Sequence, residues 1–426
     1  MAKIILYSLI SGFLLLSCSG QLDIPEKNQS DHLISIGNKE KIYSKILQEE
    51  REVFISVPKG FYGMNEQSPT FPVVYVMDGE SQFLTIVGVL DQLSAPASAN
   101  DVAPQMIVVG IPNTNRNRDL TPTQGIIGRD SASIKITGGA GLMADFIKKE
   151  LIPYVDSLYP TSAHRVLVGH SLGGLFVLNT LIKYPALFQN YLAIDPFMRW
   201  DDQKFADTVI EAVKTIDDTN ISLFIATANT RMSWMNLDDV KTDTTDIMYL
   251  MRSNLEFRDK MAASELKIKY TNQYYENEDH FQIPLMATYD GFRYFYDFYP
   301  FQQMIEYYYP RDPDEEGDLI QELENHYKKI SQAFGYEILP MESYVNSWAF
   351  GFVQFGRPEL ANRLFDLNIK NYPESPVVYG SKGYYSLSQG DTIGAIAYFE
   401  KSLNKKELPH IKSALANLKK DVKGKH

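Results

Sequence analysis

The chain has 426 residues, of which 44% are hydrophobic and 22% are charged, so it is long enough for one large hydrophobic core and a smaller second unit. Its 41 basic and 53 acidic residues leave a formal net charge of -12. No Lys/Arg cluster in the sequence is broad enough to follow a phosphate backbone, which argues against nucleic acid as a partner.

The N-terminal segment is typical of an exported protein. Lys3 precedes an apolar run from Ile4 to Leu16. This run is too short to cross a bilayer, because a transmembrane helix needs about 20 consecutive apolar residues. We therefore predict a signal peptide over residues 1–17.

Cys18 follows this run and is the only cysteine in the chain, so no intramolecular disulfide can form. The residues Leu15, Leu16 and Ser17 before it resemble the lipobox of bacterial lipoproteins. That resemblance implies lipid attachment at Cys18, a polar tether over 18–30, and a protein anchored in the bacterial cell envelope, at the outer membrane or in the periplasm. An ordinary signal peptide that contains a cysteine is the alternative, and it also places the mature protein outside the cytoplasm.

Residues 31–305 alternate between short apolar runs and longer helical patterns, and we predict one domain here. The apolar runs are rich in β-branched residues and end in turn residues, as strands buried on both faces do. They cover 71–79, 105–112, 165–171 and 221–229. Helical patterns at 141–159 and 174–185 lie between them. This alternation predicts an α/β fold with a mostly parallel sheet flanked by helices.

The segment "RVLVGHSLGGLFVL" places Ser171 between glycines, where a strand pattern gives way to a helix pattern. A serine at such a turn needs glycines beside it, because side chains two positions away would collide. The turn also aims the backbone N–H of Leu172 toward the position where an oxyanion would form. This context favours Ser171 as a nucleophile over a small residue at an ordinary turn.

A serine nucleophile needs a base, and the chain has seven histidines. His280 is our candidate, because its polar loop "YYENEDHFQIP" follows the strand-like "LKIKYTNQYY", where this fold returns its base to the serine. The acidic partner is open. Asp243 in "MNLDDVKTDTTD" is our choice, although an aspartate there also suits a helix cap. Glu278 or Asp279 beside the histidine, or a Ser-His pair without an acid, are the alternatives.

The C-terminal part of the sequence has helical patterns and no strand pattern. We predict a linker over 306–335 and a small all-α domain over 336–426. Three pairs of residues recur at a spacing of 34 positions: Gly356 and Gly390, Ala361 and Ala395, Phe365 and Phe399. This period resembles the tetratricopeptide repeat, with two repeats legible where three or more are the norm. We expect the last helix to cap these repeats, and a plain helical hairpin is the alternative.

Over residues 42–299 the chain resembles the "Putative esterase" family of α/β-hydrolases, which includes feruloyl, acetylxylan and enterochelin esterases. The resemblance rests on the segments "FPVVYVMDGESQF", "VVGIPNTNRNRDLTPT", "ELIPYVDSLYPTSAHRVLVGHSLGGLF", "AIDPFMRW" and "ENEDHFQIP". It implies an α/β-hydrolase fold with Ser171 as nucleophile and His280 as base.

The same resemblance extends to the residues around the nucleophile. It implies an oxyanion hole formed by the amides of Leu172 and Glu80, and substrate-facing loops that contain Arg118 and Trp200. Alternatively, Arg118 forms an ordinary local ion pair, and Trp200 packs in the core. The chain departs from the family pattern in having no acid directly after the "ATAN" strand.

These features together predict a serine hydrolase that cleaves carboxylic esters through an acyl-enzyme, without a metal or an organic cofactor. A siderophore ester or an acylated polysaccharide would suit an envelope lipoprotein, and an arginine such as Arg118 near the cleft would favour an anionic substrate. The alternative is an inactive hydrolase-fold protein that docks a partner through its helical repeats.

Overall fold

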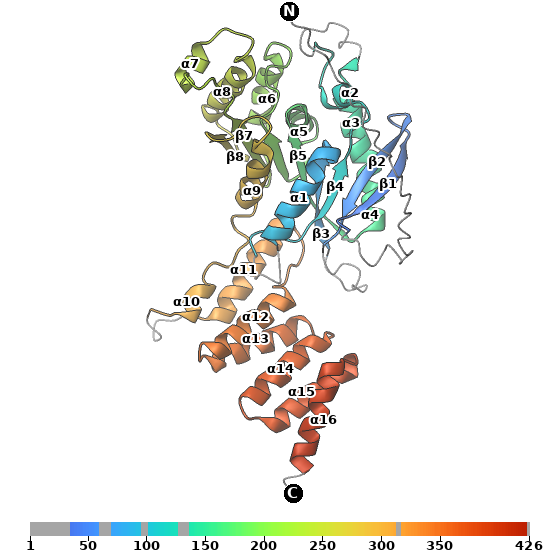
Figure 1. Cartoon of the computed structure of the whole chain (residues 1–426), viewed down its shortest axis with the longest axis vertical. Coiled ribbons are helices and arrows are strands. Elements are labelled where there is room, and N and C mark those ends of the chain that lie inside the picture. The colour runs from blue at the N-terminus through green and yellow to red at the C-terminus, as the bar shows by residue number, and fades with distance from the viewer. Residues whose placement is uncertain (1–34, 59–69, 95–100, 127–135, 312–316, 424–426) are drawn as a thin grey trace, which may run out of the picture. The chain divides into compact units, whose positions relative to one another are not determined.

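The computed structural model describes residues 35–58, 70–94, 101–126, 136–311 and 317–423 (Figure 1). The predicted signal peptide, the tether and the lipidation site at Cys18 lie outside these residues. Within the described ranges, no helix is both long and apolar enough to span a bilayer.

An eight-stranded sheet occupies the centre of the residues up to 300, with the order β1-β2-β4-β3-β5-β6-β7-β8 (Figure 1). The β1–β2 and β2–β4 pairs are antiparallel, and every other pair is parallel. The predicted mostly parallel sheet is therefore confirmed. The strands are β1 (Asn38–Ser44), β2 (Glu49–Ser56), β3 (Phe71–Met77), β4 (Ile107–Ile111), β5 (Thr161–His170), β6 (Asn190–Ile194), β7 (Ser222–Ala228) and β8 (Lys269–Tyr275).

Helices cover both faces of this sheet, so its central strands are buried on both sides, as their continuous apolar runs predict. One face packs against α1 (Gly79–Leu93) and α9 (Ile283–Phe295). The other packs against α3 (Ala140–Phe146), α4 (Ile152–Leu158), α5 (Leu172–Lys183), α6 (Lys204–Lys214) and α8 (Tyr249–Ala262). The short helices α2 (Arg116–Leu120) and α7 (Leu237–Thr242) lie in loops after β4 and β7. This is the expected α/β-hydrolase architecture.

The C-terminal part is helical, as predicted. Its helices are α10 (Met304–Tyr308), α11 (Leu319–Phe334), α12 (Glu342–Gln354), α13 (Pro358–Asn371), α14 (Pro376–Ser388), α15 (Thr392–Lys405) and α16 (Pro409–Lys423). The 34-residue spacing marks equivalent positions in two helix pairs. Gly356 and Gly390 follow α12 and α14 with φ values of 73° and 79°, a backbone region that favours glycine. Phe365 and Phe399 are both fully buried, and α16 packs on the second pair through Ile411.

The helix α11 fills much of the segment that we expected to be a linker. Its apolar side belongs to the same hydrophobic core as α1 and α9. Phe334, at its end, lies with its ring centroid 4.5 Å from that of His164, near the amino end of β5. The serine of interest follows the opposite, carboxyl end of the same strand. The helix α11 therefore packs against the sheet near the amino end of β5, away from Ser171.

Candidate active site

Ser171 occupies a sharp turn between β5 and α5. Its φ of 59° and ψ of -115° are outside the regions that most L-residues adopt, and such strain persists where the surrounding structure fixes it. A Cβ on Gly169 would lie 2.3 Å from the carbonyl oxygen of Gly173, so a side chain is excluded there, as the sequence predicts. The turn presents the Ser171 hydroxyl at the carboxyl end of β5.

His280 lies beside this hydroxyl. Its Nε2 is 3.1 Å from Ser171 Oγ, although the two residues are 109 positions apart in the sequence. The loop that carries His280 connects β8 to α9 and is tied to the end of β7, because the amide of Asn229 donates to the carbonyl oxygen of Glu278 at 2.8 Å. The structure thus brings together the two residues that the sequence singles out as nucleophile and base.

Asp195 completes the arrangement from the loop after β6. Its Oδ2 lies 2.5 Å from His280 Nδ1, and its side chain is only 3% exposed. Its Oδ1 accepts hydrogen bonds from the amide of Ala228 at 3.1 Å and from Asn254 Nδ2 at 2.8 Å. A buried carboxylate is stable only when it is paired or hydrogen-bonded, and these contacts fix its orientation toward the imidazole.

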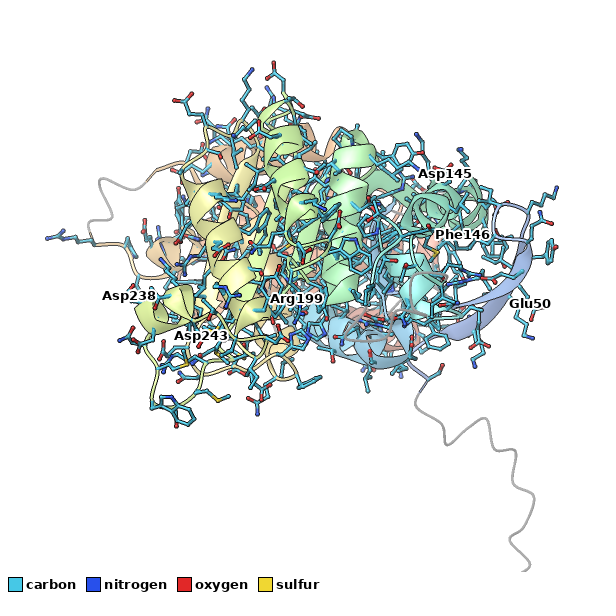
Figure 2. All side chains as sticks on the ribbon, turned by 90° about the horizontal axis from the view of Figure 1, so that it is seen from above. Glu50, Asp145, Phe146, Arg199, Asp238 and Asp243 are labelled. Atoms are coloured by element: carbon cyan, nitrogen blue, oxygen red, sulfur yellow. The ribbon has the colours of Figure 1, made fainter. Side chains whose placement is uncertain are left out.

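This position corrects the prediction of Asp243 as the acidic partner. Asp243 ends α7, and its Oδ1 accepts hydrogen bonds from the amide and hydroxyl of Thr245 at 2.7 and 2.5 Å. Figure 2 shows it near Asp238, at the border of the molecule. Asp279, the neighbour of His280, caps its own turn by accepting from the amide of Phe281 at 2.8 Å. In the sequence Asp195 directly follows the apolar residues of β6, but only the structure shows that this strand pairs with β5.

His170 packs against the base. The centroids of the His170 and His280 rings are 4.5 Å apart. Burial, together with the charge that His280 can carry, lowers the pKa of His170 to about 4. His170 is therefore neutral near pH 7, and it adds an uncharged ring to one side of the imidazole.

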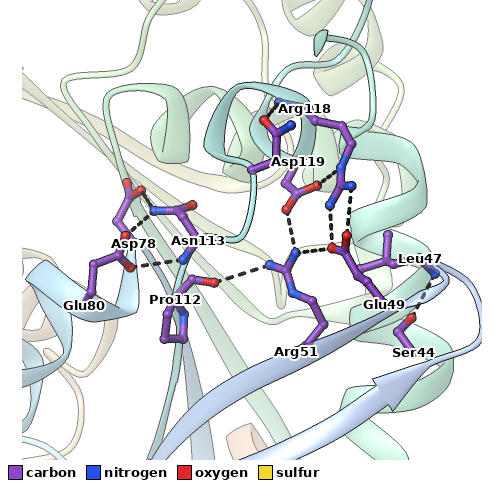
Figure 3. Close-up of polar contacts among 11 residues, drawn as sticks. Ser44, Leu47, Glu49, Arg51, Asp78, Glu80, Pro112, Asn113, Arg118 and Asp119 are labelled. Atoms are coloured by element: carbon purple, nitrogen blue, oxygen red, sulfur yellow. Dashed lines mark hydrogen bonds and ion pairs between the residues drawn. The ribbon is translucent and has the colours of Figure 1, made fainter.

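The two amides expected to form an oxyanion hole both lie at helix N-termini. Leu172 is the first residue of α5, and Glu80 is the second residue of α1. N–H groups in the first turn of a helix have no partner within the helix, and they lie at the positive end of its dipole. The Glu80 side chain is held separately, since its carboxylate accepts from Asn113 N at 3.2 Å and Asn113 Nδ2 at 2.7 Å (Figure 3).

The structure contradicts the predicted substrate contact of Trp200 and shows that Arg118 forms ion pairs, and the predicted substrate contact of Arg118 stays a prediction. Arg118 binds the two carboxylate oxygens of Glu49 at 2.5 and 3.0 Å and also pairs with Asp119 at 2.6 Å (Figure 3). Trp200 is 1% exposed, and its Nε1 donates to Thr123 Oγ1 at 2.9 Å. Three of the five N–H groups of the Arg118 guanidinium are thus used within the protein, and the Trp200 ring is buried away from any substrate.

In the part of the chain that the structure describes, no group of three or more His, Cys, Asp or Glu side chains is arranged to hold a metal ion.

Comparison with known proteins identifies the family. Residues 44–292 match the family described as "Putative esterase", which is more than half of the 426 residues. The chain belongs to this family. The predicted resemblance is confirmed over nearly the same range.

Individual relatives agree with this assignment. The ferri-bacillibactin esterase BesA of Bacillus subtilis is 33% identical over 142 residues, which are 31% of this chain and 49% of the relative. The chain thus aligns with about half the length of that relative. An IroE-like serine hydrolase from Shewanella oneidensis is 28% identical, with a TM-score of 0.62, and the match covers 78% of this chain and 98% of the other.

A further solved structure covers a larger share of this chain. An uncharacterised protein from Capnocytophaga ochracea is 15% identical, has a TM-score of 0.57, and covers 90% of this chain and 99% of its own. At this identity the likeness shows the fold alone.

Proposed function

We propose that the chain is a serine hydrolase of carboxylic esters. The observation that carries this proposal is the continuous contact from Asp195 to His280 to Ser171, with distances of 2.5 and 3.1 Å. A hydroxyl becomes an effective nucleophile when a neighbouring imidazole takes its proton and a third group orients that imidazole. Membership of the esterase family supports the same reaction.

The reaction follows from this geometry. His280 Nε2 accepts the Ser171 proton while Oγ attacks the ester carbonyl, and the buried Asp195 carboxylate stabilises the imidazolium. The amides of Leu172 and Glu80 bind the carbonyl oxygen as it becomes negative. His280 then donates the proton to the departing alcohol. A water molecule attacks the acyl-enzyme by the same route, which releases the acid and returns the proton to Ser171.

For the substrate, we favour the ester bond of a siderophore. The support is the likeness to an esterase named for ferri-bacillibactin, which extends over 31% of this chain. An acylated polysaccharide is the second substrate to test. We also propose that lipid at Cys18 anchors the enzyme in the cell envelope, and that the C-terminal helix pairs are tetratricopeptide-like and recruit a protein partner.

The experiment that tests this function compares the protein without residues 1–18 with its Ser171→Ala variant on a short-chain p-nitrophenyl ester. We expect hydrolysis by the parent protein, no detectable hydrolysis by the variant, and labelling of Ser171 by a fluorophosphonate probe. Absence of both hydrolysis and labelling in the parent protein would reject the enzyme and favour the inactive docking protein.

A further inference from the structure

The side chain of Arg116 connects two turns at the carboxyl edge of the sheet. Its Nε donates to Asp78 Oδ1 at 2.6 Å and its Nη2 donates to Asp78 Oδ2 at 2.9 Å. The same Nη2 lies 3.4 Å from the carbonyl oxygen of His170. Asp78 precedes α1, whereas His170 precedes the Ser171 turn. One guanidinium therefore contacts the turn that leads to Glu80 and the turn that carries the nucleophile.

Asp78 is held in an unusual way for a residue that precedes a helix. Its backbone is left-handed, with φ 54° and ψ 46°, and its carboxylate makes no capping hydrogen bond to α1. An aspartate at this position commonly caps the helix. Here the carboxylate, 7% exposed, binds Arg116. It also accepts a hydrogen bond from Asn113 Nδ2 at 2.6 Å, the contact drawn in Figure 3. The Asp78 carboxylate thus binds side chains of the loop after β4 rather than the N–H groups of its own helix.

This carboxylate also lies against the nucleophile turn. A Cβ placed on Gly173 would be 3.2 Å from Asp78 Oδ2. Gly173 is the second residue of α5 and directly follows Leu172. The loops after β3, β4 and β5 therefore meet in one network, in which Asp78, Arg116 and His170 are the contact points.

The location of Asp78 has an electrostatic consequence. Ester hydrolysis places negative charge on a carbonyl oxygen near the N-terminus of α5, and a second negative charge close by opposes it. The bidentate contact with Arg116 compensates the Asp78 carboxylate in a partly buried site, where the interaction is screened less than in bulk water.

We propose that Arg116 is a positioning residue for oxyanion stabilisation. It holds the turn that carries the Glu80 amide against the turn that carries the Leu172 amide, and it neutralises Asp78 between them. This inference rests on the proposed ester hydrolysis. It assigns Arg116 no contact with substrate, so its loss acts on turnover rather than on binding.

The test compares Arg116→Ala with Arg165→Ala in the protein without residues 1–18, on a neutral p-nitrophenyl ester. Arg165 is a matched control, because it also forms an ion pair, with Asp156 at 2.8 Å, and contacts a backbone carbonyl, that of Ala163. It lies toward the amino end of β5, away from Ser171. For Arg116→Ala we expect kcat to fall roughly 10- to 100-fold with little change in KM, and for Arg165→Ala neither should change.

Two further measurements separate positioning from a general loss of folding. Added guanidinium chloride at low millimolar concentration should restore part of kcat in Arg116→Ala, because the ion can occupy the vacated site, and it should have no such effect on Arg165→Ala. Replacing Asp78 by Asn in the Arg116→Ala background should also recover part of kcat, because the uncompensated charge is removed. If Arg116→Ala does not fold, Arg116→Lys should show a smaller fall in kcat with KM unchanged, since one ammonium cannot reproduce the bidentate contact.

Two results would contradict the proposed role of Arg116. An unchanged kcat in Arg116→Ala or Arg116→Lys, or a rise in KM alone, would overturn the positioning role, and the rise in KM would indicate direct substrate binding. If the proposed ester hydrolysis is itself wrong, the parent protein will show no Ser171-dependent hydrolysis. That result is seen before any arginine is changed, so the two failures are distinguishable.

Discussion

The Asp195 carboxylate lies 2.5 Å from His280 Nδ1, although the two residues are 85 positions apart and Asp195 follows β6 rather than β7. The β6 strand pairs directly with β5, so the loop after it reaches the same edge of the sheet as the Ser171 turn. The acid therefore approaches the imidazole from the adjacent strand, while Ala228 at the end of β7 contributes a backbone amide to that acid.

Replacing Asp195 by Asn should preserve the shape of the site but lower kcat by roughly 10³- to 10⁴-fold, because the neutral amide no longer favours the required imidazole tautomer or stabilises the imidazolium. Asp243→Asn is the matched control and should change kcat less than about twofold, because its side chain contacts Thr245 and Arg252 rather than the His280 imidazole. Steady-state kinetics of both variants decide between the two acids. A large loss in Asp243→Asn with none in Asp195→Asn would reverse the assignment.

How well the sequence predicts a site residue depends on how far along the chain the residues that position it lie. Ser171 is recognisable because a strand, two glycine positions and a helix define its turn locally. The acid is not, because its identity depends on which loops meet at the sheet edge. Arg118 and Trp200 likewise owe their structural roles to Glu49 and Thr123, which lie 69 and 77 positions away.

The overall fold is easier to infer than the site, since buried parallel strands leave long apolar runs in the sequence. The strand β1 cannot be predicted in this way. It lies at an end of the sheet and most of its residues are at least partly exposed, so it has no such run. The role of α11 cannot be predicted for a different reason. Nothing in its own segment of the sequence shows that its apolar side packs into the core of the sheet.

Changing Arg118 to Ala should reduce stability without changing substrate preference. The variant leaves the carboxylates of Glu49 and Asp119 with fewer partners, and we expect a loss of about 1 kcal/mol or more in the free energy of unfolding. Because Arg118 is not assigned to substrate, the ratio of kcat/KM for neutral and anionic esters should match that of the parent protein. A selective loss for the anionic ester would show that the arginine binds substrate after all.

His164 should make the protein less stable in acid. Burial lowers its folded-state pKa from 6.5 to about 4, and its Nε2 lies 3.1 Å from Tyr296 Oη. Below pH 6.5 the unfolded chain binds a proton that the folded protein does not, so stability falls as pH decreases from 6.5 toward 4. The loss should approach about 3 kcal/mol. Urea unfolding across this range should show it, and His164→Gln should remove this part of the pH dependence; an unchanged slope would contradict the assignment.

Asp101 should make the protein less stable as the pH rises. Burial raises its pKa from 3.8 to about 7, even though Tyr327 donates to its carboxylate at 3.2 Å. Because the folded protein binds this proton more tightly than the unfolded chain, stability falls as pH rises from about 4 to about 7. Asp101→Asn cannot titrate, so it should be more stable than the parent protein at pH 8, by on the order of 4 kcal/mol. Equal stability of the two proteins at pH 8, measured by urea unfolding, would show that Asp101 is already ionised without cost.

Two truncations should distinguish the helices that complete the core from those that do not. A chain that ends at Pro373 loses α14, α15 and α16 but keeps α11, so the core shared with α1 and α9 stays covered. It should remain folded and hydrolyse esters at nearly the parent rate, because Ser171 lies at the other end of β5. A chain that ends at Arg311 also loses α11, α12 and α13, and it exposes the aromatic side chains beneath α11, including Tyr296. It should aggregate or melt roughly 10 °C lower or more, since each large apolar side chain returned to water costs about 2 kcal/mol. Thermal unfolding and ester hydrolysis of the two chains measure this difference, and equal stability would mean that α11, α12 and α13 are separable from the core of the sheet domain.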